Sequence, residues 1–242
     1  MTARRALVTG GGSGIGLAVA QALRRAGYDT VIAGRSKARL EAAGGPYVVM
    51  DVCDPASIAA GLDKAGEIDI FIAAAGGAAT APVLKMAHGE WDRMLSLNLT
   101  SIFHCAQAVI PAMVARNWGR FVAIGSTASV KGYRYASGYA AAKHGVLGFV
   151  RSLALELAPT GVTANTLCPG YSDTPLIDGA VAAIVAKTGR SVEDVRAGFA
   201  ASNPMGRLIK PTETAAAALW LVSEGGAAVN GQAIAIDGGE SA

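Results

Sequence analysis

The stretch that decides the fold is ALVTGGGSGIG at residues 6–16, which leads into LAVAQALRRAG at residues 17–27. It begins with a short apolar run typical of a strand, passes through closely spaced glycines, and ends in a helical pattern. Glycines let the backbone turn sharply and approach a pyrophosphate, whose charge then lies on the free N–H groups of a helix N-terminus. The spacing is G-x-x-x-G-x-G, so a plain tight turn is the alternative. The strand–turn–helix context nevertheless predicts a dinucleotide-binding unit.

Beyond this unit, short apolar runs alternate with longer helical patterns. The runs are almost continuously apolar, as expected for strands covered on both faces. Strands alternating with helices predict βαβ units and a parallel sheet with right-handed crossovers, which is an α/β fold. No linker or repeat is visible, so residues 1–242 are predicted to form a single domain. The predicted strands are 6–9, 30–33, 47–52, 70–74, 121–124, 164–167 and 233–236, and the predicted helices are roughly 14–27, 55–65, 88–116, 138–158 and 211–223.

One segment departs from this rhythm. Residues 172–206 form a long insertion between the sixth and seventh strands, with helical patterns at 176–187 and 191–201. Ligands of such sheets bind at the carboxyl ends of the strands, where insertions carry function. We therefore expect this insertion to be a substrate lid.

Composition narrows the class of protein. A net charge of +3 is too small for a nucleic-acid footprint, and 52% apolar residues exclude a mainly disordered chain. The three cysteines lie far apart and the three histidines lack zinc-ligand spacing, so neither a disulfide framework nor a bound metal is expected. The N-terminus has no signal-peptide pattern, and no uninterrupted apolar run of about 20 residues occurs. A cytoplasmic protein without a membrane span is predicted.

The residues after the second strand suggest which dinucleotide binds. An acidic residue near this position binds the ribose hydroxyls of NAD, whereas a basic one accepts the 2′-phosphate of NADP. Gly34 offers no carboxylate, and Arg35 offers a planar fork suited to phosphate, which Ser36 or Lys37 could assist. The pattern favours NADP over NAD, and a solvated basic helix start is the alternative.

A second constellation carries the chemistry of a proton transfer. Tyr139 and Lys143 are spaced i, i+4 at the start of a predicted helix, so both side chains lie on one face. A tyrosine has a pKa near about 10, and a neighbouring ammonium lowers it by stabilising the phenolate. This spacing alone is a weak pattern, but Ser126 ends the fifth strand upstream and Asn98 lies within the long helical stretch.

With these motifs in order along its whole length, the chain resembles the short-chain dehydrogenase/reductase family. The motifs are TGGGSGIG at 9–16, MDV at 50–52, AAAG at 73–76, Asn98, Ser126, YAAAK at 139–143, CPGYSDT at 168–174 and AIDGG at 235–239. The resemblance implies a Rossmann-type, doubly wound, three-layer fold whose seven strands follow the order 3-2-1-4-5-6-7. It is strongest for 3-oxoacyl-thioester reductases and for dehydrogenases of 3-hydroxy acids or 3-hydroxyacyl-CoA.

The resemblance also implies the catalytic roles. Tyr139 would exchange the proton with the substrate oxygen, and Ser126 would bind and orient that oxygen. Lys143 would bind the nicotinamide ribose hydroxyls and lower the pKa of the tyrosine. Asn98 would hold a water that links the lysine to solvent.

The cofactor contacts are implied in the same way. Asp51 has an alternative as the cap of the helix opened by Pro55, and Thr174 as an ordinary cap before Pro175. The family usually has Asn-Asn-Ala-Gly where this chain has 73–76, but the turn glycine remains, so cofactor binding should survive. The implied contacts are Gly10, Gly12, Ser13, Gly14, Ile15, Gly16, Arg35, Ser36, Asp51, Val52, Gly76, Tyr139, Lys143, Pro169, Gly170 and Thr174.

The substrate side is less specific. Lys131 or Arg134 could meet a carboxylate or the phosphates of a coenzyme A or carrier-protein arm, or could be solvated loop charges. Tyr133 and Tyr135 could wall an apolar pocket or pack the loop. The expected activity is NADP-dependent hydride transfer to a 3-oxoacyl thioester. The alternatives are an NAD-dependent dehydrogenase of a 3-hydroxy acid, 3-hydroxyacyl-CoA or other secondary alcohol, and a non-catalytic NADP sensor. A homotetramer, or a dimer, is implied by the resemblance.

Overall fold

The computed structural model describes residues 3–242 and contains a seven-stranded sheet. Every neighbouring pair of strands is parallel, and their order is β3-β2-β1-β4-β5-β6-β7. This confirms the predicted class and strand order. The strands are β1 (Arg5–Thr9), β2 (Asp29–Gly34), β3 (Tyr47–Val49), β4 (Ile70–Ala73), β5 (Gly119–Ile124), β6 (Val162–Pro169) and β7 (Ala233–Ile236).

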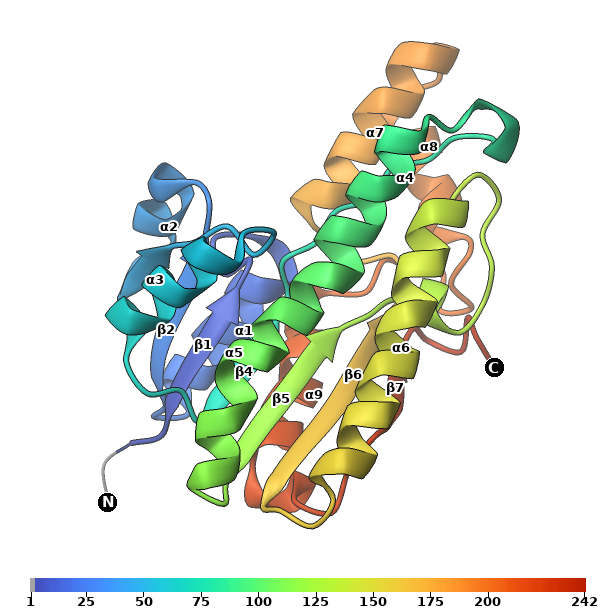
Figure 1. The fold of residues 1–242 in the computed structure, drawn as a ribbon. Helices are drawn as coiled ribbons and strands as arrows, with labels where there is room; N and C mark the ends of the chain where they lie inside the picture. Colours follow the sequence, from blue (N-terminus) through green and yellow to red (C-terminus); the bar gives the residue numbers. More distant parts are fainter. Residues whose placement is uncertain (1–2) are drawn as a thin grey trace.

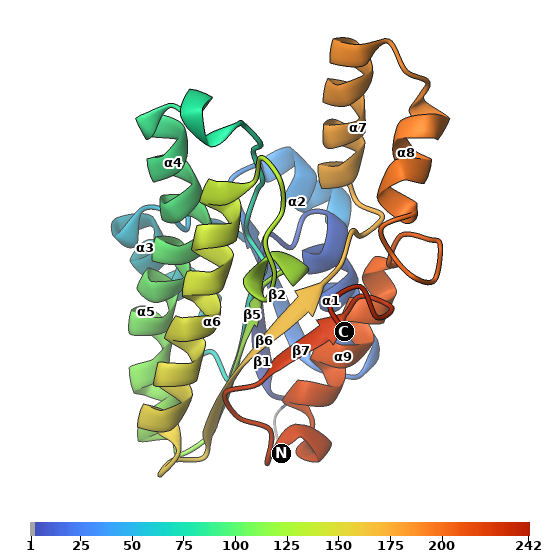
Figure 2. The same cartoon turned by 90° about the vertical axis from the view of Figure 1, so that its right-hand side faces the viewer.

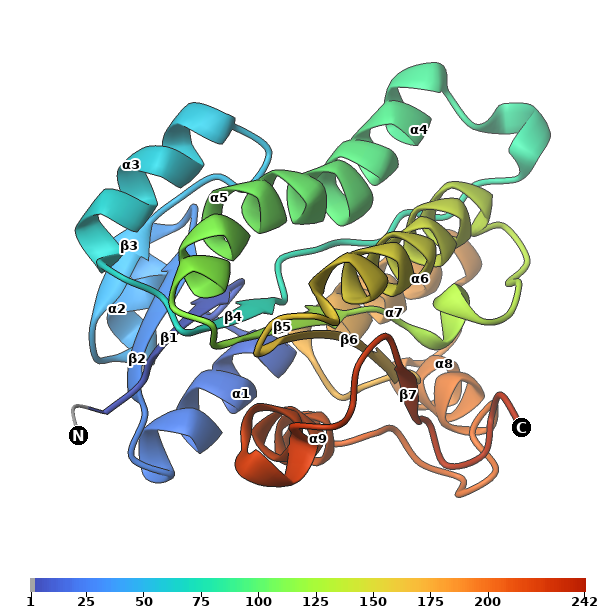
Figure 3. The ribbon, with the colours of Figure 1, turned by 60° about the horizontal axis from the view of Figure 1, so that its bottom comes forward.

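Helices cover both faces of the sheet (Figures 1 and 3). One face carries α3 (Pro55–Ala65), α5 (Ser101–Ala115) and α6 (Ser137–Leu157). The other carries α1 (Gly14–Arg25) and α9 (Pro211–Val222). The three layers follow from strands that are apolar on both sides and must be covered on both.

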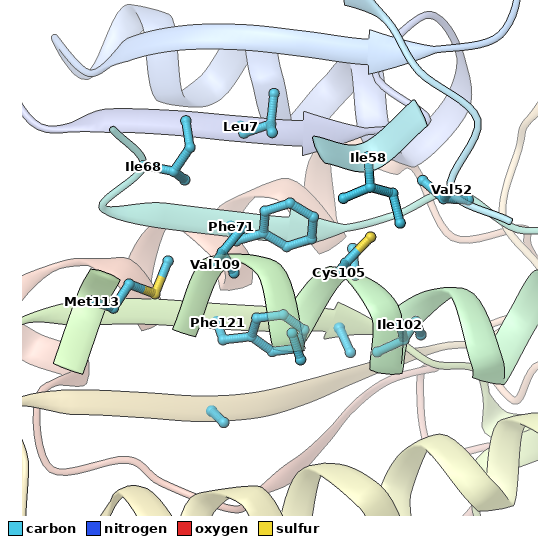
Figure 4. Close-up of a cluster of buried hydrophobic side chains, with 14 of the residues drawn as sticks. Leu7, Val52, Ile58, Ile68, Phe71, Ile102, Cys105, Val109, Met113 and Phe121 are labelled. Carbon is cyan, nitrogen blue, oxygen red and sulfur yellow. The ribbon is translucent and has the colours of Figure 1, made fainter. Parts of the chain in front are cut away.

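The larger core lies between the sheet and the α3–α5–α6 layer (Figure 4). At its centre the rings of Phe71 on β4 and Phe121 on β5 stack with centroids 5.6 Å apart. Helix α5 adds Ile102, Cys105 and Met113, which are almost fully buried. Burial of each large apolar side chain contributes about 1.5–3 kcal/mol, so this layer holds the carboxyl ends of β4 and β5 in fixed positions.

The predicted helix at 88–116 is not one regular helix. It divides into α4 (His88–Leu95), a π-helical turn (Ser96–Thr100) and α5. Side chains in and next to the turn bond to the backbone: Asn98 donates to the Met94 carbonyl at 3.1 Å, and Ser101, the first residue of α5, donates to the Leu97 carbonyl at 2.7 Å. Such competing bonds loosen the regular ladder, and π turns occur often at functional sites. By length and composition the stretch His88–Ala115 would pass as a membrane span, but the buried apolar residues of its α5 part belong to the core of this sheet.

Two further differences from the predictions lie around β3. Residues 37–43, left without a helix in the prediction, form α2 (Lys37–Ala43), whose first turn is capped by Ser36, with the Arg39 amide 3.4 Å from the serine oxygen. The strand predicted at 47–52 ends at Val49. The Met50 amide still donates to the Gly34 carbonyl at 3.0 Å, but the next residue bonds elsewhere: the Asp51 amide donates to Ser57 Oγ at 2.9 Å, and the Asp51 carboxylate accepts from the Cys53 amide.

The insertion after β6 folds as a hairpin of α7 (Pro175–Thr188) and α8 (Val192–Ala200), close to the predicted helices. We call it the α7–α8 hairpin. It projects beyond the carboxyl ends of the strands (Figures 1 and 2). It has a small core of its own in Ile177, Val181 and Val195. Arg196 of α8 also forms ion pairs, one with Asp178 of α7 at 2.7 Å and one with Asp173.

Candidate active site

The glycine turn between β1 and α1 requires residues without a side chain. Gly10 and Gly14 have φ angles of +66° and +54°, which residues with a side chain rarely adopt. A Cβ atom on Gly16 would lie 2.4 Å from the Gly10 carbonyl oxygen. The turn therefore brings bare backbone to the N-terminus of α1, where N–H groups without helical partners suit a phosphate.

A cavity of about 480 Å³ opens beside this turn. It reaches from the glycines to the ends of β2, β3 and β4, and its size lies within the range of small-molecule sites. The cradle of bare backbone and the two arginines at its rim fit a dinucleotide. Eight predicted contacts line the cavity: Gly10, Gly12, Ser13, Arg35, Ser36, Asp51, Val52 and Gly76; so do Gly34, Arg39, Leu40, Met50, Ala75 and Leu97, which were not predicted.

Arg39 is the main cofactor-side residue that the sequence reasoning missed. Helix α2 places it at the cavity, four residues after Arg35 and with its Cβ 3.3 Å from the position of a Cβ on Gly12. Lys37 instead lies 3.7 Å from Glu41 and is not part of the lining. A second arginine shortly after Arg35 was the available signal, and using it required the short helix after Ser36 to be recognised.

The remaining predicted cofactor contacts lie around the turn but do not line the cavity. Ile15 packs into the core beneath α1. Pro169 ends β6, and the Gly170 amide donates to the Ile236 carbonyl at 3.1 Å. Thr174 faces the turn, with its methyl group 3.3 Å from the position of a Cβ on Gly14. The segment after β6 therefore contacts the glycine turn directly.

The capping alternative is wrong for Asp51, whereas Thr174 does occupy the N-cap position of α7 but makes no side-chain cap bond. The cap of α3 is Asp54, whose carboxylate accepts from the Ala56 amide at 2.9 Å. Asp51 remains at the cavity with its carboxylate bonded to the Cys53 amide at 3.0 Å. The Thr174 hydroxyl donates backwards to the Ser172 carbonyl at 3.2 Å rather than accepting from the first turn of α7.

Thr9 holds the segment at 73–76 in which the two expected asparagines are missing. Its buried hydroxyl oxygen accepts from the amides of Ala74 and Ala75 at 3.1 and 3.2 Å and donates to the Ile72 carbonyl at 3.3 Å. One side chain from β1 thus fixes three backbone groups at the end of β4. Gly76 is held at the cavity without asparagine side chains at 73 and 74.

The four predicted catalytic residues come from three elements. Asn98 lies in the π turn, Ser126 follows β5, and Tyr139 and Lys143 lie in the first turns of α6. The side-chain oxygen of Asn98, Oδ1, accepts from the Gly77 amide at 3.1 Å. A Cβ placed on Gly76 would lie 3.0 Å from that oxygen and 3.8 Å from Lys143 Nζ. Asn98 and Lys143 therefore meet at the edge of the cavity.

Burial sets the electrostatics of this group. It raises the pKa of Tyr139, and the hydrogen bond with Ser126 opposes that rise. Lys143 is 4% exposed, its Nζ donates to the Ile124 carbonyl at 2.7 Å, and burial lowers its pKa to about 8. The ammonium lies 5.7 Å from the tyrosine ring centroid. Burial, rather than the expected lowering by the ammonium, therefore dominates at Tyr139, and a protonated phenol suits a proton donor.

We expect a pH profile that follows from these two shifts. Reduction of a carbonyl needs the Tyr139 phenol protonated and the Lys143 ammonium charged. The raised tyrosine pKa keeps the phenol protonated, while the ammonium is lost as the pH rises through about 8. The kcat/KM for reduction should be flat near neutrality and fall above about pH 8, approaching tenfold per pH unit. Steady-state rates from pH 6 to about 10 measure it.

The control for this profile is Lys143→Arg, because a guanidinium stays charged across the whole range. The kcat/KM that this variant retains should begin to fall only at a higher pH than in the wild-type protein. An identical fall in both proteins would assign the titration to another group.

The substrate side of the site is shaped by aromatic rings. The Tyr133 ring lies 5.8 Å from that of Tyr171, which lies 4.9 Å from that of Phe199 on α8. These three rings connect the segment after Ser126 to the α7–α8 hairpin. Tyr135 is 53% exposed, with φ at +65°. Of the two predicted wall residues, Tyr133 alone joins these rings.

Lys131 matches neither prediction, because it pairs within the protein and is neither a free cation for a substrate anion nor a solvated loop charge. Its ammonium forms an ion pair with the Glu240 carboxylate at 3.2 Å and donates to the Glu240 carbonyl at 3.1 Å. Tyr133 donates to the same carboxylate at 2.5 Å. Sequence reasoning missed Glu240, and no local signal marks it, because it lies 109 residues from Lys131. Within residues 3–242, no group of three or more histidine, cysteine or acidic side chains is placed to bind a metal.

A parallel sheet with a glycine turn, a cavity at the strand ends and a Ser–Tyr–Lys group beside it defines a dinucleotide-binding oxidoreductase. The family model described as "Enoyl-(Acyl carrier protein) reductase" matches residues 10–241. The chain belongs to the short-chain dehydrogenase/reductase family.

Similar proteins cover nearly the whole chain. The 3-oxoacyl-[acyl-carrier-protein] reductase FabG of Escherichia coli is 35% identical, with 97% of this chain and 96% of the relative covered. The D-beta-hydroxybutyrate dehydrogenase of Cupriavidus necator is 36% identical, with 99% and 98% covered. A crystal structure of a variant of actinorhodin polyketide ketoreductase with NADPH has a TM-score of 0.92 and 33% identity, covering 99% of this chain and 97% of that one.

Proposed function

We propose that the protein uses NADPH to reduce a 3-oxoacyl thioester carried by coenzyme A or a carrier protein. The observation that carries this proposal is the meeting of Asn98, Ser126, Tyr139 and Lys143 beside a glycine-lined cavity with a basic rim. Similarity to a 3-oxoacyl reductase and to a ketoreductase solved with NADPH supports the choice of substrate and cofactor.

In this mechanism the protein binds, orients and transfers a proton. Ser126 donates a hydrogen bond to the substrate carbonyl oxygen, and the Tyr139 phenol delivers a proton to the same oxygen. When bound, the cofactor supplies the hydride that the carbonyl carbon receives. Lys143 binds the nicotinamide ribose, and Asn98 connects the lysine to solvent through a water. Position and electrostatics are the contributions of the chain.

For the cofactor, we propose that Arg35 and Arg39 together bind the 2′-phosphate of NADP. Arg35→Asp should lower the kcat/KM ratio of NADPH to NADH by about 10- to 100-fold, because a charge-assisted hydrogen bond contributes about 1.5–3 kcal/mol. Arg39→Ala should lower it by a smaller factor. Lys37→Ala is the matched control, because that lysine pairs with Glu41 outside the cavity lining. A ratio that does not move in Arg35→Asp would remove this arginine from the phosphate site.

The function itself is tested by following NADPH consumption with acetoacetyl-CoA as substrate. Oxidation of NADPH that depends on the thioester supports the proposal. Activity confined to NADH or NAD, with 3-hydroxybutyrate as the alcohol, supports the second candidate, which the similarity to a D-beta-hydroxybutyrate dehydrogenase favours. Tight cofactor binding without turnover over a broad ketone panel would instead indicate a sensor.

We also propose that the α7–α8 hairpin is the substrate lid and that the chain forms a cytoplasmic homotetramer, or a dimer. The aromatic connection from Tyr133 to Phe199 supports the lid assignment. On the outer face of α5 and α6, Phe103 and Leu155 are 40% and 78% exposed, and Trp220 of α9 is 45% exposed. Exposed apolar side chains of this size suit subunit contacts. Light scattering of the purified protein measures the assembly.

A further inference from the structure

Glu240 is a buried carboxylate on the segment after β7, at the substrate end of the site. Its side chain is only 2% exposed. One oxygen, Oε1, accepts from Tyr133 and pairs with Lys131, whereas Oε2 is buried with no hydrogen-bond partner among residues 3–242. The carboxylate is thus neutralised by one lysine and remains only partly satisfied.

The position of Glu240 is fixed by its own segment. Gly238 and Gly239 adopt φ angles of +64° and +91°, which turn the chain back. The Asp237 carboxylate accepts from the amides of Gly239 and Ser241, each at 3.0 Å. The turn holds the Glu240 side chain inward against Gly170, where a Cβ would lie 2.9 Å from Oε2.

A short chain of contacts links Glu240 to the catalytic residues. Tyr133, which donates to Glu240, also bonds to the hydroxyl of Thr127, the residue after Ser126. The Tyr133 ring packs against Tyr171, which is close enough to act on the pKa of Tyr139. Figure 2 shows the segment after β7 near the end of β6, below the α7–α8 hairpin. The cluster therefore lies on the substrate side, away from the adenosine cavity.

We propose that Glu240 determines which substrates the site accepts according to their charge near the reacting carbonyl. Because the Lys131 ammonium is paired with Glu240, it is not free to bind a substrate carboxylate. The second Glu240 oxygen would also repel such an anion. The wall beyond Ser126 therefore accepts a substrate that is uncharged around the reacting carbonyl, a thioester or ester, and rejects the free 3-oxo acid. Arg134, the other cation of this segment, is exposed and lies over the Tyr135 ring, with its guanidinium carbon 5.5 Å from the centroid.

This inference rests on the proposed function and extends it to the choice between two kinds of 3-oxo substrate. The test compares kcat/KM for the uncharged N-acetylcysteamine thioester of acetoacetate with kcat/KM for acetoacetate, both with NADPH. Because both substrates are measured on one enzyme preparation, the ratio does not depend on the folded fraction. The wild-type protein should prefer the thioester by about 100-fold or more, since an anion there lacks a partner.

Glu240→Gln is the decisive variant, because it keeps the shape and an acceptor for Tyr133 but releases the Lys131 charge. The ratio should move toward acetoacetate by about tenfold or more. The matched control is the double variant Lys131→Met, Glu240→Gln, in which the released charge is removed and the gain for acetoacetate should disappear.

Two results would overturn the inference, and they differ from each other. If both substrates are reduced and the ratio is the same in Glu240→Gln, or the gain persists in the double variant, the charge assignment is wrong and the proposed function stands. If the wild-type protein reduces neither of these substrates nor acetoacetyl-CoA, the proposed function is wrong and the inference falls with it.

Discussion

Tyr139→Phe is expected to lower kcat for carbonyl reduction by about 10³-fold, within the range of 10²–10⁴ that a positioned acid contributes. The variant removes one oxygen and leaves the ring in place on the first turn of α6. Since the proton donor is the only group lost, the substrate oxygen must take its proton from water. The adenosine cavity does not include this residue, so the Kd for NADPH should stay nearly unchanged. Stopped-flow reduction and a fluorescence titration measure the two quantities.

The matched control for this variant is Tyr135→Phe. Tyr135 lies on the connection just before α6 and carries the same hydroxyl, but it is 53% exposed. Loss of this hydroxyl should change kcat by less than about twofold, because the side chain is exposed and phenylalanine keeps the same ring on the same backbone. If Tyr139→Phe kept a tenth of the wild-type rate or more, the assigned proton donor would be wrong.

Lys143→Met is expected to lower kcat by about 10²-fold or more and, at the same time, to raise the Tm. The folded protein holds this ammonium at 4% exposure, and burial lowers its pKa from 10.5 to about 8. A lysine whose pKa is lowered by folding destabilises the folded state wherever both states are protonated. The methionine fills similar space without a charge, so a gain of a few degrees follows from removing a cost of a few kcal/mol.

The pH dependence of that gain identifies its cause. Below about pH 8 the full penalty of the buried ammonium is present in the wild-type protein, and it shrinks between about 8 and 10.5 as the folded form becomes neutral. The difference in Tm between variant and wild type should therefore be largest near pH 6 and small near pH 10. Lys37→Met, at a side chain that is 68% exposed, is the control and should show no such trend. A gain independent of pH would point to packing rather than charge.

Most of the fold could be predicted from the sequence, because the signals for its elements are local. Each strand was an apolar run, and the glycine turn and the Tyr139–Lys143 pair are short motifs attached to the ends of single elements. Parallel strands have their carboxyl ends at one edge of the sheet, so the residues after β1, β2, β4 and β5 are expected to lie together there. The cavity contacts at Gly10, Arg35 and Gly76 follow from that rule.

What the sequence did not reveal depends on contacts between distant segments or on side chains that compete with the backbone. The π turn around Asn98 keeps an apolar face continuous with α5, so periodicity could not locate it. The segment at 73–76 is held by Thr9 of β1, which lies 65 residues before Ala74 in the sequence, and not by the expected asparagines. Arg39 required the short α2 helix, and Glu240 required a turn that brings the segment after β7 back to Lys131.

The α7–α8 hairpin has a consequence for how this enzyme could diversify. Its apolar residues pack on one another and, outside the hairpin, on Tyr171 and Leu208, and its ion pairs stay within the segment from Asp173 to Arg196. Its contact with the glycine turn passes through Thr174, at the hairpin's own base. Residues 175–200 can therefore be exchanged or lengthened as a module while the proton donor and the cofactor cradle are inherited unchanged. New substrates would then be acquired by replacing one exchangeable part of the gene rather than by rebuilding the catalytic centre.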